Sequence, residues 1–410
     1  MNNVDFDIIV IGGGAAGFFA AIHAADNGHS VCILEKTQKL LSKVKVSGGG
    51  RCNVMHDLDY PSQLVNYYPR GGKNLKKSFE IFGPKETRDW FEKRGLKLKT
   101  EEDGRVFPIT DDSQTVIDLL LNEAQNRNVE IRKGVEIINI KKDSQLFVLD
   151  SKTGEKYFAK KVIISSGGNN KSSAYDWIRK LDINIAKPIP SLFTFNVPQS
   201  DMKDLMGLSV KKGSVQVPGT KWKMEGAILI THWGFSAPAV IKLSAWAAID
   251  FFKKNYHFPI LINWTPYGEE EIRLKLAEFR DNHPKKAVQA NPLFGLPSRL
   301  WIRLCENAEI NSKQHYADLP KKVFNRFIEM IIRSSFDVKG KTTFKEEFVT
   351  CGGVELSEVD LKSYESKKIP GLYFAGEVLN VDGITGGFNF QHAWTSGYLA
   401  GKSASISIDK

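Results

Sequence analysis

Apolar runs bounded by glycine dominate the start of the chain. The run over residues 7–11 leads straight into Gly12, a helical pattern over 18–27 stops at Gly28, and a second apolar run covers 31–34. Continuous apolar runs of this length are typical of strands buried on both faces of a parallel sheet, and such strands need a crossover helix between them. The pattern therefore predicts a strand–helix–strand unit at the start of an α/β domain.

Alternating apolar and polar positions predict further strands over 135–140, 145–150 and 156–164. The third of these ends in a glycine turn at 165–168, which we expect to pack close to the first turn. Residues 188–190, Pro-Ile-Pro, then have the composition of a linker.

The middle of the chain changes character at Glu269. Before it, strand patterns cover 192–197, 214–217 and 226–231. After it, helical spacing and intervening prolines indicate a bundle of three or four helices, and a strand near 341–348 returns the chain.

We therefore expect an α/β fold in which a Rossmann-like domain is formed by both ends of the chain. A β-rich domain that carries the helical bundle is inserted between them. The expected boundaries are 1–190 and 350–410 for the first domain, 191–268 and 334–349 for the inserted domain, and 269–333 for the bundle.

The first glycine turn has the spacing that binds a dinucleotide. Gly12 permits the turn, Gly14 lets a pyrophosphate approach the backbone, and Gly17 lets the helix pack against the strand. Glu35 lies 18 residues beyond Gly17, where an acid can accept hydrogen bonds from a ribose. This fingerprint fits FAD and NAD equally well. The candidate cofactor-binding residues of this region are Gly12, Gly14, Ala15, Ala16, Gly17, Glu35, Lys36 and Val135.

A second glycine-rich segment, near the far end, favours FAD. Residues 371–377 form an apolar run ending in glycine and an acid, and 382–391 lead into a helical pattern that continues to about 404. FAD is long, so a returning segment must hold its flavin half, and a helix entry can place N–H groups at the flavin edge where charge develops. We therefore expect non-covalently bound FAD. The candidate contacts are Gly376, Glu377, Asp382, Gly386, Gly387, Phe388, Asn389 and Gln391.

A third glycine cluster lies between these ends. Three successive glycines after Ser47 allow the backbone to wrap a ligand without Cβ clashes, and Arg51 and Asn53 add directional donors. The candidates here are Lys43, Ser47, Gly48, Gly49, Gly50, Arg51 and Asn53, together with Ser166, Gly167 and Gly168 of the turn at 165–168.

These motifs resemble the signatures of the HI0933-like family of bacterial flavoproteins. The similarity is carried by 47–53 and 381–389, with further matches at 104–108, 231–236 and 351–354, and it covers essentially the whole chain. The resemblance implies an FAD-dependent oxidoreductase, of the kind described as aminoacetone-oxidase-like or NAD(P)/FAD-dependent. No second nucleotide-binding fingerprint appears between 191 and 345, so any NADH or NADPH would bind transiently in the substrate cleft.

Composition adds few constraints. The 410 residues are 42% apolar and 25% charged, which is ordinary for a globular protein of two or three domains. Four cysteines show no CxxC pair and no zinc spacing, so we expect reduced thiols and no metal site. No apolar run reaches membrane-spanning length, and acids stand where a signal peptide would begin, which indicates the cytoplasm.

The formal charge of +10 raises the question of an anionic partner. Between Arg70 and Thr100 there are ten Lys and Arg against four acids. A solvated helical face explains this stretch most simply, and steering of an anionic ligand is the functional alternative. Because no recognised RNA- or DNA-binding motif accompanies these cations, we do not expect nucleic acid as the main partner.

Flavin chemistry needs few protein side chains, because the cofactor transfers the hydride. His232 and His392 are weak catalytic candidates, and a structural role is favoured for each. The leading interpretation is an oxidoreductase acting on a small or medium organic molecule, either an NAD(P)H-linked reductase of a conjugated double bond or ketone, or an oxygen-dependent oxidase of an amine or amino ketone. The alternatives are a flavoprotein that binds or modifies RNA, and a flavoprotein whose FAD is structural.

Overall fold

The computed structural model describes residues 4–342 and 349–406, and these form two compact units. One unit combines the described residues up to 191 with those from 349 onward, and the other comprises residues 192–342. The expected α/β fold with a Rossmann-like domain is confirmed, because a parallel sheet with a strand–glycine turn–helix unit forms the centre of the first unit.

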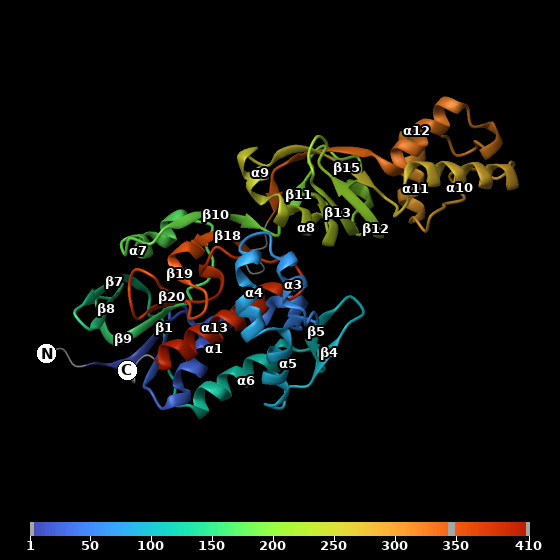
Figure 1. Ribbon diagram of the computed structural model, residues 1–410. Coiled ribbons are helices and arrows are strands. Elements are labelled where there is room, and N and C mark those ends of the chain that lie inside the picture. Colours follow the sequence, from blue (N-terminus) through green and yellow to red (C-terminus); the bar gives the residue numbers. More distant parts are fainter. Residues whose placement is uncertain (1–3, 343–348, 407–410) are drawn as a thin grey trace. The chain divides into compact units, whose positions relative to one another are not determined.

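The main sheet of the first unit has the order β19-β20-β21-β9-β1-β2-β6, and β7 and β8 extend it beside β9 (Figure 1). The five strands from β21 to β6 are parallel. The strands are β1 (Phe6–Ile11), β2 (Val31–Glu35), β6 (Glu130–Lys133), β7 (Ile137–Asp143), β8 (Leu146–Ser151), β9 (Lys156–Ile164), β19 (Val359–Asp360), β20 (Glu365–Ser366) and β21 (Leu372–Phe374).

The helices α1 (Ala15–Ala24) and α13 (Phe388–Ile406) pack against each other although they come from opposite ends of the chain (Figure 1). Small residues make this close approach possible. A Cβ added at Gly397 would lie 2.7 Å from the Ala16 carbonyl oxygen, and one at Gly401 would overlap the Ala20 carbonyl. The C-terminal helix therefore continues the helical layer from α1, which packs on β1, to β9 and β21.

Smaller elements surround this core. A three-stranded sheet has the order β3-β5-β4, and β10 pairs with β18 in a two-stranded sheet. The elements are β3 (Met55–His56), β4 (Leu98–Thr100), β5 (Arg105–Pro108), β10 (Ile185–Ser191), β18 (Val349–Val354), α2 (Ser42–Gly50), α3 (Pro61–Leu64), α4 (Gly72–Ile81), α5 (Pro84–Glu92), α6 (Ser113–Asn126) and α7 (Asp176–Arg179).

Two predictions about local structure were wrong. The first helix begins at Ala15 rather than at residue 18, because the glycine turn feeds directly into it. Residues 188–190 are not a linker but part of β10, where Pro190 lies opposite Thr350 of β18. The pairing is irregular between Ala186 and Ile189, and such an irregularity in a two-stranded sheet accommodates residues that lack an N–H group.

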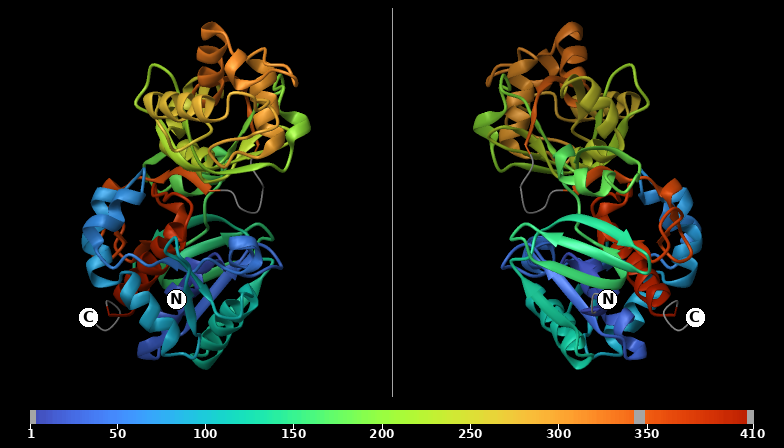
Figure 2. Two further views of the ribbon diagram at one scale, coloured as in Figure 1. Left: turned by 90° about the vertical axis from the view of Figure 1, so that its right-hand side faces the viewer. Right: turned by 90° about the vertical axis from the view of Figure 1, so that its left-hand side faces the viewer.

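The second unit contains an antiparallel sheet of order β16-β15-β12-β13-β14-β11-β17. Figure 1 shows the helices α10, α11 and α12 together at one end of this unit, and the left view of Figure 2 faces that end. Its elements are β11 (Thr194–Asn196), β12 (Ser209–Gln216), β13 (Lys223–Ile230), β14 (Gly234–Ser236), β15 (His257–Asn263), β16 (Ser334–Lys339), β17 (Lys341–Thr342), α8 (Pro238–Trp246), α9 (Ala248–Lys253), α10 (Glu269–Asn282), α11 (Ser298–Asn307) and α12 (Lys321–Ile332).

The core of the second unit is continuous from its sheet to its helices. Phe235 and Trp264 from the sheet region and Trp301 and Phe327 from α11 and α12 are all fully buried in one cluster. Of the return strand expected near 341–348, β17 is present, and residues 343–348 lie outside the described part. Within residues 4–342 and 349–406, no helix has the length and apolar character needed to cross a membrane.

Candidate functional site

The turn between β1 and α1 contains two glycines, Gly12 and Gly17, that no other residue could replace without a clash. A Cβ at Gly12, where φ is +111°, would lie 2.5 Å from the Ser165 carbonyl oxygen at the end of β9. A Cβ at Gly17 would overlap the Gly12 carbonyl itself. Gly14 differs from both, because no atom lies within 4 Å of the position its Cβ would take. One side of the turn is thus packed against protein, and the side at Gly14 is open.

The open side coincides with the start of α1. The helix is preceded by Gly14, which supplies no side-chain cap, and its first turn contains no acid. Phe18 donates the first N–H of the helical ladder, to the Gly14 carbonyl at 3.0 Å. The N–H groups of Ala15, Ala16 and Gly17 have no helical partner and lie at the positive end of the helix dipole, which is the arrangement that binds a phosphate group.

Glu35, at the end of β2, contacts the same turn. Its Oε2 accepts the Gly13 N–H at 2.8 Å, and its Oε1 accepts both the N–H and the hydroxyl of Thr37 at 2.8 Å. The Val135 N–H donates to the Glu35 carbonyl at 2.9 Å, and Lys36 is exposed. Glu35 therefore fixes the loop as well as offering a half-buried carboxylate beside it.

This geometry predicts how a substitution of Glu35 would affect the affinity for FAD. Because each carboxylate oxygen has further acceptor capacity beyond these bonds, it can also accept ribose hydroxyls. Glu35→Ala is expected to weaken FAD binding by roughly 1–3 kcal/mol, measured as the dissociation constant by fluorescence titration of the apoprotein. Thr37→Val is the control, because it removes only one neighbour of the carboxylate. Equal affinities for Glu35→Ala and the parent chain would contradict the role.

The end of β9 and the 3-10 turn at Gly376–Val378 lie against this turn. Ser166 follows the Ser165 carbonyl that packs on Gly12, and a Cβ at Gly376 would lie 2.6 Å from the Ala16 Cβ. Glu377 accepts from Lys43 Nζ at 2.5 Å and from the Thr350 N–H at 2.9 Å. A Cβ at Gly168 would lie 2.5 Å from a Glu377 oxygen, so Gly167 and Gly168 run past that carboxylate. Residues predicted from four separate segments therefore meet here.

The triple-glycine segment has a mixed character. It falls within α2, but Ser47, Gly48 and Gly49 depart from helical geometry, and both glycines are left-handed with φ of +59° and +71°. No atom lies within 4 Å of a Cβ at Gly49 or Gly50, so this stretch presents open backbone. Arg51 points elsewhere. It pairs with Glu101 at 2.6 Å and stacks over Phe107, so its guanidinium is engaged within the protein.

Asp382 occupies a buried ion pair that the sequence did not reveal. Arg70 Nε donates to Asp382 Oδ1 at 2.5 Å and its second nitrogen also contacts the carboxylate, while the Ser191 hydroxyl donates to Oδ2 at 2.8 Å. Asp382 is fully buried. Burial lowers the pKa of Arg70 to about 10, which still leaves it protonated at neutral pH. Asp382 therefore anchors the loop before α13 rather than offering a free carboxylate.

The loop from Gly383 to Asn389 is held by its own side chains. Asn389 Oδ1 accepts the Gly383 N–H at 2.8 Å, and its Nδ2 donates to the Gly383 carbonyl at 2.9 Å. Phe388 is buried, and its carbonyl accepts the Tyr68 hydroxyl at 2.7 Å. With the amide of Asn53 oriented so that its oxygen faces Gly387, that oxygen accepts the Gly387 N–H at 3.0 Å. The entry to α13 is thus preformed.

Three predicted residues are not part of this arrangement of open backbone and helix N-termini. Gln391 is fully buried, and its amide donates to Thr87 and Thr395 inside the first unit. His392 is 2% exposed, and burial lowers its pKa to about 4, so it remains neutral and has no solvent contact for proton exchange. His232 lies in the second unit between β13 and β14, where it is exposed and packs edge-on against Trp233.

Sequence reasoning missed His56, Ser191 and Thr350, and it considered Arg70 as the start of the basic stretch that ends at Thr100. Each contacts a predicted residue from far away in the sequence: His56 Nδ1 bonds to the Gly386 carbonyl at 3.1 Å, for example. One signal was available for Arg70. An acid in an apolar stretch such as 381–384 needs a cationic partner if it is buried, but the pattern alone does not say which.

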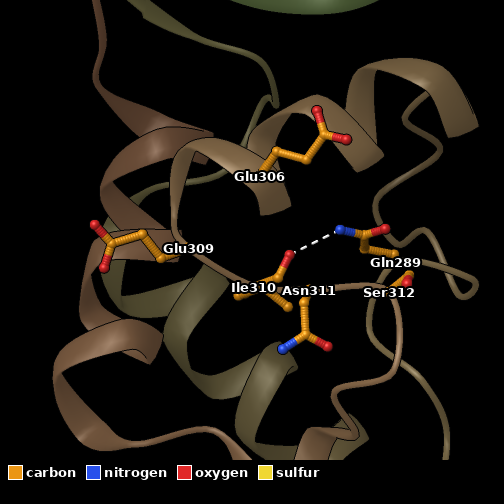
Figure 3. A pocket seen from close by; sticks show the side chains of 6 residues that line it. All are labelled: Gln289, Glu306, Glu309, Ile310, Asn311 and Ser312. Atoms are coloured by element: carbon orange, nitrogen blue, oxygen red, sulfur yellow. Dashed lines mark hydrogen bonds between the residues drawn. The ribbon is translucent and has the colours of Figure 1, made fainter.

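A separate pocket of about 420 Å³ lies in the helical part of the second unit (Figure 3). It contains none of the predicted site residues. Its two carboxylates are paired, Glu306 with Arg303 at 3.2 Å and Glu309 with Arg326 at 2.5 Å. The Gln289 amide donates to the Ile310 carbonyl at 2.7 Å across it. The pocket has the character of a solvated surface hollow.

The geometry of the first unit therefore fits a bound dinucleotide. The open Gly14, the three free N–H groups of α1 and the Glu35 carboxylate would hold the adenosine and pyrophosphate portion. The open backbone at Gly49 and Gly50 and the α13 entry would be available to the flavin portion. Together the fold and site define a Rossmann-type flavoprotein. The chain belongs to the HI0933-like family, because the model described as "HI0933-like protein Rossmann domain" matches residues 6–403. It is an FAD-dependent oxidoreductase.

Similar proteins cover nearly the full length of the chain. It is 29% identical over 408 residues to the ribosomal RNA dihydrouridine synthase of Escherichia coli K12, covering 96% of each chain. It is 28% identical over 406 residues to the 3-dehydro-bile acid delta(4,6)-reductase of Clostridium scindens, covering 96% of this chain and 98% of the relative.

Among solved structures, a 3-ketosteroid-delta4-(5alpha)-dehydrogenase from Rhodococcus jostii RHA1 matches with a TM-score of 0.54 at 14% identity. The match covers 99% of this chain and 98% of the other. At this identity the likeness establishes a shared fold.

Proposed function

We propose that this chain reduces a carbon–carbon double bond conjugated to a carbonyl group, with NADH or NADPH as the transient electron donor. The observation that supports this most directly comes from the two full-length relatives, whose names describe reactions on the same kind of bond. Dihydrouridine is uridine in which the ring double bond beside a carbonyl has been saturated. A 3-dehydro bile acid with delta(4,6) unsaturation carries double bonds conjugated to its keto group.

The chemistry of such a reduction sets the requirements on the protein. Bound FAD, once reduced by NADH or NADPH, would supply the hydride to the carbon remote from the carbonyl. A proton must then reach the carbon next to the carbonyl, and the oxygen must be stabilised while charge develops on it. His232 is the candidate proton donor on this proposal, because it is exposed whereas His392 is buried and neutral.

A specific observation favours a second candidate substrate, a uracil base in RNA. Residues 192–342 contain 22 Lys and Arg against 14 Asp and Glu, which is eight of the ten net positive charges of the chain. Lys211 and Lys212 are both exposed at an irregularity in β12, so two cations stand side by side on one strand. A concentration of cations on one unit supports binding to a phosphate backbone.

The reaction is tested by anaerobic stopped-flow spectroscopy of the FAD-loaded protein. The flavin is first reduced with NADH, NADPH or dithionite, and then mixed with a conjugated cyclic enone, the matching saturated ketone, or a uridine-containing RNA. We expect the enone or the RNA to reoxidise the flavin and the saturated ketone to leave it reduced. If His232 supplies the proton, His232→Gln slows reoxidation by about 100-fold without changing FAD binding.

The controls separate the competing functions. Reduction of the flavin by an amine in the absence of NAD(P)H would contradict the proposal and favour an amine oxidase. Reoxidation by RNA but not by enones, with a binding constant that falls steeply as salt rises, would assign the RNA substrate. A reduced flavin that reacts with none of these acceptors would overturn the proposal.

A further inference from the structure

Two side chains of one short segment hold the same peptide group at the start of α13. The Asn53 amide oxygen accepts the Gly387 N–H at 3.0 Å, and His56 Nδ1 donates to the Gly386 carbonyl at 3.1 Å. The carbonyl of Gly386 and the N–H of Gly387 belong to one peptide bond. That bond is therefore held at both of its polar ends, which fixes its plane.

Asn53 and His56, which together clamp this peptide group, are themselves held in place by neighbouring residues. Asn53 is 8% exposed, and its amide nitrogen donates to the Met55 carbonyl at 2.9 Å and the Val106 carbonyl at 3.3 Å. The His56 ring stacks on Phe388 with centroids 4.7 Å apart. A Cβ at Gly387 would lie 2.8 Å from the Met55 Cα, so the clamping segment and the clamped turn are in direct backbone contact.

The clamped peptide immediately precedes the free donors of α13. Gln391 N–H donates to the Gly387 carbonyl at 3.0 Å and closes the first helical turn. The N–H groups of Phe388, Asn389 and Phe390 come before that bond, so they lack helical partners and mark the positive end of a 19-residue helix. Any rotation of the Gly386–Gly387 peptide would redirect these donors, because they follow it in the chain.

We propose that Asn53 and His56 are positioning residues that direct the α13 N-terminus at the flavin of bound FAD and so favour its reduced form over its oxidised form. Reduced flavin carries additional negative charge at its pyrimidine edge, and fixed N–H donors stabilise developing negative charge without reorganising. Gly387 contributes to this site through its backbone geometry rather than through its own N–H, which Asn53 occupies. The inference goes beyond the proposed function and depends on FAD binding alone.

Three substitutions of the half-buried His56 separate its hydrogen bond from its ring. His56→Asn keeps a donor near the Nδ1 position and loses the ring, His56→Phe keeps a stacking ring and loses the donor, and His56→Ala loses both. The readout is the midpoint potential of the bound flavin, measured against a reference dye with no substrate present. FAD stoichiometry and the thermal unfolding midpoint are recorded for each variant.

We expect His56→Phe and His56→Ala to lose about tenfold of the preference for reduced over oxidised FAD, which lowers the potential by about 30 mV for a two-electron couple. His56→Asn should stay within about threefold of the parent chain. Unchanged potentials in the Phe and Ala variants would overturn the proposal. A shift in His56→Asn and His56→Ala without one in His56→Phe would also overturn it, because the ring rather than the hydrogen bond would then be responsible.

Two further outcomes can be interpreted: loss of FAD from one variant, and failure of the proposed reduction. If His56→Phe retains no FAD, the comparison of His56→Asn with His56→Ala still isolates the hydrogen bond. Because no substrate is added, failure to reduce a conjugated double bond would leave these potentials unaffected, so the two proposals fail independently.

Discussion

Gly14→Ala is expected to fold as well as the parent chain and to bind FAD poorly, whereas Gly17→Ala is expected to fold poorly. The two glycines stand three residues apart in one turn, yet their surroundings differ. Gly14 has φ of −94° and no atom within 4 Å of a Cβ, so alanine is accommodated there by the protein. A Cβ at Gly17 overlaps the backbone of Gly12, which cannot move without separating α1 from β1.

The magnitudes follow from overpacking. A methyl group on Gly14 would occupy the space through which the pyrophosphate approaches the backbone, and we expect a loss of about 1–3 kcal/mol in FAD affinity. Gly17→Ala should destabilise the fold by about 3 kcal/mol or more. Urea unfolding of the apoproteins and FAD titration measure the two effects separately. A Gly14→Ala protein with full FAD affinity would show that the cofactor does not approach this turn.

Acidification from neutral pH to about pH 4 is expected to destabilise the first unit through its buried histidines. His23 is 3% exposed, and burial lowers its pKa to about 4. His392 is in the same condition. In the unfolded chain a histidine has a pKa of about 6.5, so between these values the unfolded state binds a proton that the folded state does not. Stability therefore falls as the pH falls through this window, and the slope vanishes below it.

The size of the effect is about 3 kcal/mol for each histidine at most. His23 has a structural reason to stay neutral, because its Nδ1 donates to the Phe19 carbonyl at 2.7 Å and its Nε2 accepts the Trp90 indole N–H at 2.9 Å. Protonation of Nε2 would place its N–H against the indole N–H of Trp90, so that two donors would face each other. Urea unfolding at a series of pH values measures the slope. His23→Gln should flatten it, and a slope unaltered in that variant would show that other groups control the acid response.

Local patterns predicted the parts of the fold that local sequence specifies. The apolar run of β1, the turn at Gly12–Gly17 and the strand of Glu35 were identified correctly because hydrophobic period and glycine spacing act over a few residues. The same logic failed at 188–190. Proline usually marks a linker, but here the pairing of Pro190 with Thr350 depends on a strand about 160 residues further on, which no local pattern contains.

The candidate site shows the same division. Glycines that allow close approach can be recognised from the sequence, but the partners of polar side chains cannot. Arg70 meets Asp382 across 312 residues, and His56 meets Gly386 across 330. From the sequence, other arginines and histidines were equally good candidates to pair with Asp382 and Gly386. Only the tertiary packing decides that Arg70 and His56 are the partners. Arg51 shows the same limit, because its place beside a glycine loop gave no sign that Glu101 and Asp111 would pair with its guanidinium.

The packing of α13 on α1 has a consequence for folding during translation. α1 leaves the ribosome about 370 residues before α13 begins to appear, which at common rates of synthesis is an interval of about 20–75 s. During that time the side of α1 that Gly397 and Gly401 will cover has no partner, and Phe18, Phe19 and Ile22, which are fully buried in the finished unit, are exposed or held elsewhere. The apolar side of α1 is therefore open to unwanted contacts throughout this interval, and FAD can be captured in full only after α13 has been synthesised.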